Sequence, residues 1–287
     1  MAYVETPAPR RRRLAQELRR IREATEMTGE EAARRVGWSA AKVSRIETAK
    51  TFPSEDDIVT LANLYGVGGV VLGDVLKLRK DATQKGWWEK YNAALDQGYM
   101  AYLGLEAEAI VMRNWESTIV PGLLQTEGYI KALLGKVLHP VNQIPPIWSH
   151  HRVEARLERQ RRHLYGPEPV TLHAIIDEAT LRRTVGGPRI MLEQLQHLEA
   201  VSERPNVKLR IITERTQSPV PTGPFVHFTF RDFPDTVYLE DLIGGRFVED
   251  AEDVFYYERA FEHLTEVALD EPRSRLLIRD TMAYWQT

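Results

Sequence analysis

A short run of small and basic side chains has the chemistry needed to contact a nucleic acid. Lysine and arginine can donate to phosphate oxygens and guanine edges, serine can donate to phosphate, and small residues permit close approach to a groove. The residues assigned to this candidate DNA-binding surface are Ser39, Ala40, Lys42, Ser44 and Arg45, with Thr28 just upstream. A basic run, Arg10, Arg11, Arg12 and Arg13, is expected to contact phosphate or an adjacent minor groove.

The spacing of apolar residues places this run on the second of two short helices that meet at a tight corner, Gly37–Trp38. Thr28 and Ser39 are expected to cap the two helices, because their hydroxyls can accept from the first free backbone N–H groups. Gly37 can supply the positive φ that a sharp corner requires. Two helices around such a corner form a helix-turn-helix, in which the second helix enters the major groove.

Further helices are predicted on both sides of this pair, at about 12–26, from 55 onward and at about 70–80. The last of these is expected to bury Val71, Val75 and Leu78. We therefore divide the chain into a basic N-terminal arm at residues 1–13, an all-α helix-turn-helix domain at residues 14–82 and a larger domain at residues 83–287.

Charge is distributed unevenly along the chain. Residues 1–50 hold twelve Lys and Arg against seven Glu, a net charge of +5, so the rest of the chain carries −8 of the total of −3. Phosphate neutralisation supplies most nucleic-acid affinity, and a basic first module on an acidic body fits a DNA-binding protein. A charge run can also be no more than a solvated face.

Composition narrows the class of protein. The chain of 287 residues is 43% hydrophobic and 28% charged, as in soluble globular proteins, and is long enough for two domains. It contains no cysteine, and no apolar run approaches the ~18 residues of a membrane span. We expect a cytoplasmic protein, nucleoid-associated when bound to DNA, with no metal and no cofactor.

The remaining two thirds of the chain predict an α+β domain with a small sheet covered by helices. Period-two segments indicate strands at 170–177, 207–213, 225–230 and 236–242, and helices are predicted at 151–164, 188–202 and 251–269. The segment 103–115 is ambiguous between helix and strand, although Glu106 and Glu108 lie two apart, as in a strand. The arginines of 151–164 could form a second phosphate surface, but interleaved acidic residues favour a solvated or partner-facing helix.

Six side chains of this domain form a candidate partner or ligand site: Trp87, Trp88, Asp177, Glu178, Glu240 and Asp241. Adjacent tryptophans could stack on a flat ligand or clamp the linker between domains. Acid–base catalysis would need carboxylates that converge on a cleft, whereas neighbouring strand residues point to opposite faces. The sequence also lacks HExxH and GxSxG motifs. We therefore expect no enzymatic activity.

Residues 14–66 resemble the Cro/XRE family of helix-turn-helix domains, which are five-helix bundles. The matching residues are Leu18, Arg22, Thr28, Glu31, Ala33, Gly37, Ser39, Val43, Ser44, Ile46, Glu47, Pro53, Leu61 and Gly66. The resemblance implies a structural ion pair between Arg22 and Glu47. Two departures stand out: Gly29 occupies a position where the family usually has a DNA-contacting glutamine, and Ala49 replaces a common glycine.

The rest of the chain resembles a group of actinobacterial, WhiJ-like transcriptional regulators. The similar segments are 86–88, 102–109, 120–129, 152–160 and 177–183. The resemblance implies a C-terminal domain of uncharacterised biochemistry that senses a signal, often a small protein encoded nearby.

One helix-turn-helix contacts few base pairs, so we expect a homodimer on an inverted-repeat operator in double-stranded DNA. The alternative is a module whose helix-turn-helix binds another protein.

Overall fold

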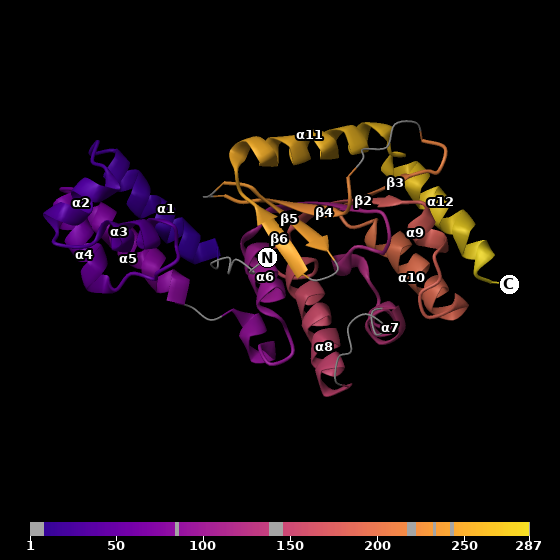
Figure 1. Ribbon diagram of the computed structural model, residues 1–287. Coiled ribbons are helices and arrows are strands. Elements are labelled where there is room, and N and C mark those ends of the chain that lie inside the picture. The colour runs from indigo at the N-terminus through magenta and orange to yellow at the C-terminus, as the bar shows by residue number, and fades with distance from the viewer. Residues whose placement is uncertain are drawn as a thin grey trace. The chain divides into compact units, whose positions relative to one another are not determined.

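The computed structural model describes residues 9–83, 86–137, 146–216, 222–231, 234–241 and 244–286. The chain folds as two compact units, Met1–Glu89 and Lys90–Thr287 (Figure 1). The last long helix of the first unit runs to Thr83, one residue beyond the domain boundary that we predict from the sequence.

The described part of the first unit is helical. Its helices are α1 (Pro9–Glu23), α2 (Gly29–Arg35), α3 (Ala40–Glu47), α4 (Glu55–Leu64) and α5 (Gly69–Thr83). Helix α1 packs against α5 and α3, and α2 packs against α3. The shared core includes Leu14, Leu18, Ile46, Ile58 and Leu61. Val75 of α5 joins this core, whereas Val71 is exposed, so the prediction that Val71 is buried was wrong.

Residues 10–13 form the first turns of α1 and not a separate arm, which corrects the predicted boundary at residue 14. The physical reason is packing. Arg10 donates from Nη1 to the backbone oxygen of Asp81, over 3.2 Å. Burial of the Arg12 side chain lowers the pKa of its guanidinium to about 10. These arginines therefore help to attach α1 to the rest of the first unit.

Hydroxyl caps and two left-handed residues set the helix ends around α3. Thr28 accepts from the backbone N–H of Glu31, and Ser39 accepts from that of Lys42, as the sequence predicts. Gly37 has a φ of +70° at the corner between α2 and α3. Ala49, just after α3, has a φ of +56°, a conformation that costs a residue with a Cβ about 1–2 kcal/mol.

In the described part of the second unit, the strands form one six-stranded sheet, ordered β3-β2-β1-β4-β5-β6. Its strands are β1 (Val111–Glu116), β2 (Thr171–Asp177), β3 (Val207–Ile212), β4 (Phe225–Thr229), β5 (Thr236–Asp241) and β6 (Gly244–Val248). Strands β1, β2 and β3 are parallel, and β4, β5 and β6 continue from β1 in antiparallel fashion. Because β1 joins the two halves, its carboxyl end meets the amino end of β4.

Helices cover both faces of this sheet (Figure 1). The remaining helices among the described residues are η1 (Trp87–Tyr91), α6 (Gln97–Glu108), η2 (Gly122–Leu124), α7 (Glu127–Ala132), η3 (Leu133–Val137), α8 (Pro146–His163), α9 (Ala179–Arg182), α10 (Pro188–Val201), α11 (Ala251–Val267) and α12 (Glu271–Tyr284). Helix α11 lies along one face, where Phe261 and Leu264 pack on Trp115 and Val237. On the other face, Tyr102 of α6 contacts Phe228.

The α+β class predicted from the sequence is confirmed, and each of the four predicted strands is present. The ambiguous segment 103–115 contains both structures, because α6 ends at Glu108 and β1 begins at Val111. The strand-like spacing of Glu106 and Glu108 was therefore misleading: both residues belong to α6. Helix α12 was not predicted.

Candidate nucleic-acid interface

The exposed side of α3 carries most of the predicted DNA-contacting residues. Ser39, Ala40, Ser44 and Arg45 are exposed, while Val43 and Ile46 on the opposite side are buried in the core. Within the described part of the chain, the Arg45 guanidinium makes no hydrogen bond or ion pair. The Arg45 side chain is therefore available to a ligand, because no internal contact has to break before it binds.

An open hollow of about 620 Å³ separates the amino end of α2 from α3. Its lining residues are Arg19, Arg22, Thr28, Gly29, Glu30, Ala40, Ala41, Ser44, Glu47 and Thr48. The small residues at Gly29, Ala40 and Ala41 keep this hollow open. A Cβ at Gly29 would meet nothing within 4 Å, so the hollow has room for a larger side chain at the position where the Cro/XRE resemblance expects glutamine.

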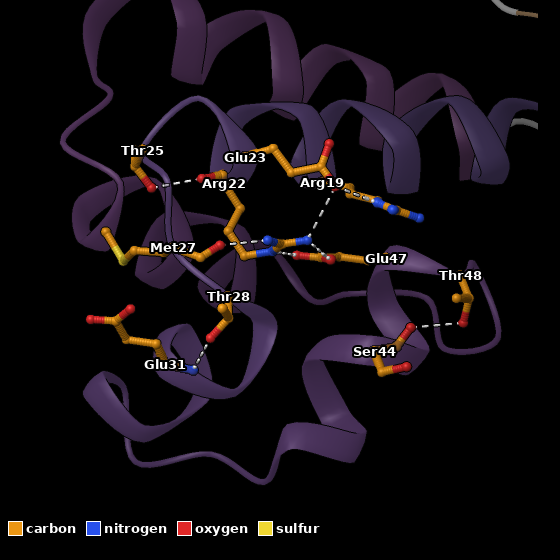
Figure 2. Close-up of polar contacts among 10 residues, drawn as sticks. All are labelled: Arg19, Arg22, Glu23, Thr25, Met27, Thr28, Glu31, Ser44, Glu47 and Thr48. Carbon is orange, nitrogen blue, oxygen red and sulfur yellow. Dashed lines mark hydrogen bonds and ion pairs between the residues drawn. The ribbon is translucent and has the colours of Figure 1, made fainter.

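Two of the residues that line the hollow, Arg22 of α1 and Glu47 of α3, form an ion pair. Arg22 donates from Nε and Nη2 to the two carboxylate oxygens of Glu47, each over 2.8 Å, and from Nη1 to the backbone oxygen of Met27 over 2.6 Å (Figure 2). The hydrogen bonds to Glu47 raise the pKa of Arg22 above its ordinary value. All of these contacts are internal, so Arg22 and Glu47 hold α1, α3 and the start of α2 together.

Lys42 has a different environment from the other residues assigned to the α3 surface. Its ammonium forms a 2.6 Å ion pair with Asp57 of α4 and lies 3.7 Å from the centre of the Trp38 ring. Burial opposes ionisation of Asp57, but hydrogen bonds from Lys42 and Ser54 hold the pKa of this carboxyl below its usual value. These contacts fasten α3 to α4, and a DNA contact by Lys42 stays a prediction.

The acidic pair at the end of β2 makes local structural contacts. Asp177 accepts from the backbone N–H of Ala179 over 2.8 Å. Glu178 is buried, pairs with Arg182 at 2.9 Å and accepts from the backbone N–H of Glu214. These contacts stabilise the turn that leads into α9. They also use the carboxylates of Asp177 and Glu178, both of which we assigned to a partner or ligand site.

The second acidic pair lies on β5, two strands from β1. Glu240 is exposed; Asp241 lies at the end of the strand, and its side chain falls outside the described residues. Burial, with a smaller contribution from the charge of Glu240, raises the pKa of Glu116, at the end of β1, to about 8. Glu116 was missed from the sequence because its environment depends on strand pairing.

The two tryptophans of η1 contact each other. Trp87 and Trp88 meet edge to face, with ring centroids 5.8 Å apart, and both are partly buried. A Cβ on Gly86 would come within 2.5 Å of the Trp88 ring, so the ring lies against the glycine backbone. Trp87 and Trp88 thus contact each other just before Glu89, the last residue of the first unit, and both interpretations of the pair stay predictions.

A buried ion pair that the sequence did not predict joins α6 and α8 in the second unit. Arg159 of α8 donates from Nε to Glu106 of α6 over 2.5 Å, and from its terminal nitrogens to the hydroxyls of Tyr99 and Tyr102 over 3.1 Å each. Burial opposes the charge on Arg159, but Glu106 raises the pKa of the guanidinium above its ordinary value. One signal was visible: the 3- and 4-residue spacings of Tyr99, Tyr102 and Glu106 put them on one side of a helix.

Two family models match the chain. Residues 13–83 match the model described as a helix-turn-helix domain, and residues 99–280 match the one described as a domain of unknown function, DUF5753. The second match covers more than half of the chain, so the protein belongs to the DUF5753 family. No curated protein and no solved structure matches the chain.

The helix-turn-helix domain indicates a regulator that binds DNA. This is the class of protein that the exposed side of α3 and the hollow beside it support. Among the described helices, none combines the length and apolar character needed to span a membrane.

Proposed function

We propose that the protein is a sequence-specific DNA-binding transcriptional regulator in which α3 enters the major groove. The single observation that carries this proposal is the exposed surface Ser39–Arg45 on a helix that is capped and packed within a helix-turn-helix domain. Arg45 supplies a donor fork for guanine or phosphate, Thr28 and Ser44 supply hydroxyls, and Ala40 allows close approach of the backbones.

The basic side chains at the start of α1 are proposed to contact phosphate from a helix and not from an extended arm. Of these, Arg11 is exposed and lies 5.1 Å from the centre of the Phe52 ring. Its charge would add a sequence-independent contribution to affinity, which depends strongly on salt. Replacing Arg11 with Gln should then reduce the salt dependence of binding.

The proposal also includes a homodimer on an inverted repeat, with half-sites about 34 Å apart. It places dimerisation in the second unit, which senses a partner protein or a small ligand and so alters the affinity for the operator. This unit is proposed to act by binding and not by catalysis. The contacts of Asp177 and Glu178 with the α9 turn support this, because they engage both carboxylates structurally.

The test is a selection of duplex sites from a random pool by the full chain, followed by gel shifts with the native upstream region. The shifts are run with and without the product of the adjacent small gene. Enrichment of a two-fold-symmetric site supports the proposal, and a change of affinity on adding the small protein supports sensing. Failure to retain any duplex at low salt would favour the alternative, a helix-turn-helix that binds another protein.

A further inference from the structure

Helix α11 covers only part of the sheet face on which it lies. On that face, the carboxyl halves of the three parallel strands are buried: Trp115, Ile175 and Ile212. Arg113 and His173, two residues before Trp115 and Ile175, are half-buried on the same face. Lys208, four residues before Ile212, is exposed on it. Side chains on one face recur at every second residue, so the amino halves of these strands leave part of the face accessible.

The three side chains of this accessible part form a row across adjacent strands. His173 of β2 is opposite Arg113 of β1 on one side and Lys208 of β3 on the other. Because residues in register on parallel strands point to the same face, the three lie side by side. Neighbouring strands are ~4.8 Å apart, so the row spans roughly 10 Å. We refer to Arg113, His173 and Lys208 as the basic row.

Positive charge exceeds negative charge around the centre of this row. Burial and the charges of Lys208, Arg113 and Arg210 together lower the pKa of His173 to about 4, against the single opposing charge of Glu271. Arg210 is already paired with Glu271 at 2.9 Å and donates to a backbone oxygen of α11. Within the part of the chain that the structure describes, the Lys208 ammonium has no hydrogen bond or ion pair.

Arg113 is held in place by a chain of polar contacts that begins on β4. His227, fully buried, bonds to Asp235 at 2.8 Å; Thr229 donates to the same carboxylate oxygen over 2.9 Å. Arg113 then donates from Nη1 to the Thr229 hydroxyl, also over 2.9 Å. This contact uses one of the five guanidinium N–H groups, so further donors remain for a ligand.

We propose that the basic row binds a small anion that carries two linked phosphate groups. Arginine and lysine are the side chains best suited to phosphate, and two phosphates can reach both ends of a row of this length. The imidazole of His173 lies between them and can donate to the bridging region. This site goes beyond the proposed DNA binding, because it lies in the second unit and uses none of the residues on α3.

The test uses the full chain, isotopically labelled at histidine, with inorganic pyrophosphate as the probe. The resonance of His173 is assigned with the variant His173→Gln. Bound pyrophosphate should raise the pKa of His173 by about one unit or more, because it offsets the surrounding positive charge. Lys208→Gln should weaken pyrophosphate binding about tenfold, whereas Lys77→Gln, an exposed lysine in α5, should leave it unchanged.

Three outcomes would overturn the proposal. One is an unchanged His173 resonance at millimolar pyrophosphate. Another is an equal loss of binding in Lys208→Gln and Lys77→Gln, which would indicate general charge attraction. The third is a His173 response to a non-specific DNA duplex without a response to pyrophosphate, which would make the row a nucleic-acid surface. Because Lys208 is exposed, its substitution should not disturb folding, and operator binding by Lys208→Gln provides an independent check that the first unit is intact.

Discussion

Each unit of the protein contains an arginine–glutamate pair that joins two helices, and the two pairs have different surroundings. Arg22–Glu47 borders an open hollow beside the exposed side of α3. Arg159–Glu106 lies in the interior, with side chains 6% and 0% exposed, and Arg159 also donates to two tyrosine hydroxyls. The first pair supports a surface available to a ligand, whereas the second supports packing between helices that cover a sheet.

The difference shows why residue type alone is a weak guide to function. Arg45 and Arg159 are both arginines on helices rich in charged residues. Arg45 is exposed and has no side-chain partner among the described residues, but Arg159 is buried and its guanidinium has three partners. The position of each relative to the core decides whether its charge faces a ligand or a neighbouring helix.

The largest effect is expected from Arg159→Ala. Removing the guanidinium leaves Glu106 buried without its ion-pair partner, which should destabilise the second unit by ~3–5 kcal/mol. Hydrogen exchange read by mass spectrometry can follow α6 and α8 separately from the helices of the first unit. The double variant Arg159→Met/Glu106→Gln should recover part of the loss. Unchanged protection of α6 and α8 in Arg159→Ala would contradict the structural role of this pair.

A smaller loss is expected from Arg22→Ala. Its three hydrogen bonds join α1, α3 and the backbone of Met27, so the first unit should lose ~1.5–3 kcal/mol. The exposed residue Arg34 serves as a matched control in the same unit, and Arg34→Ala should have little effect. Thermal melting of the three proteins measures the difference. If Arg22→Ala melts at the wild-type temperature, the pair does not hold the hollow together.

Among the described residues, the half-buried carboxyl of Glu116 has no arginine partner, which sets it apart from Glu47 and Glu106. Its pKa is about 8 in the folded protein against an ordinary 4.5, so it stays protonated while the unfolded chain ionises. Its contribution to stability is fully present below pH 4.5 and is lost as the pH rises through 8. Glu116→Gln should therefore melt like wild type near pH 4.5 and at a clearly higher temperature near pH 8.5, by more than the ~2–4 °C that 1 kcal/mol shifts a domain of this size. Parallel curves for the two proteins from pH 5 to 9 would rule out this assignment.

The smallest effect is expected at the end of α3. Ala49 adopts a φ of +56°, which glycine accepts without strain. Ala49→Gly should stabilise the first unit by up to about 1 kcal/mol, since the strain relieved exceeds the entropy lost. Ala41→Gly, inside α3, should instead destabilise it by a similar amount. The prediction fails if both substitutions change the midpoint of denaturation in the same direction.

Features set by local chemistry could be predicted from the sequence. The caps at Thr28 and Ser39 and the positive φ of Gly37 follow from neighbouring residues alone. The strand at 111–116 could not be separated from the preceding helix, because a short apolar run fits either structure until its neighbours are known.

Features set by distant contacts could not be predicted without a resemblance to known proteins. The partners of Lys42 and Arg159 come from other helices, 15 and 53 residues away in the chain. The pairing of Arg22 with Glu47, separated by 25 residues, was implied only by the Cro/XRE resemblance. The basic row depends on the register of three strands and was likewise invisible before the sheet was known.

The central claim is that the exposed side of α3 contacts base edges. The most direct measurement compares wild type, Arg45→Ala and Arg34→Ala by quantitative footprinting on the selected operator and on single-base variants of it. We predict that Arg45→Ala weakens operator binding by ~1–3 kcal/mol and loses discrimination at particular base pairs, while Arg34→Ala keeps it. If Arg45→Ala keeps the affinity and base preference of wild type, α3 is not the element that contacts the bases.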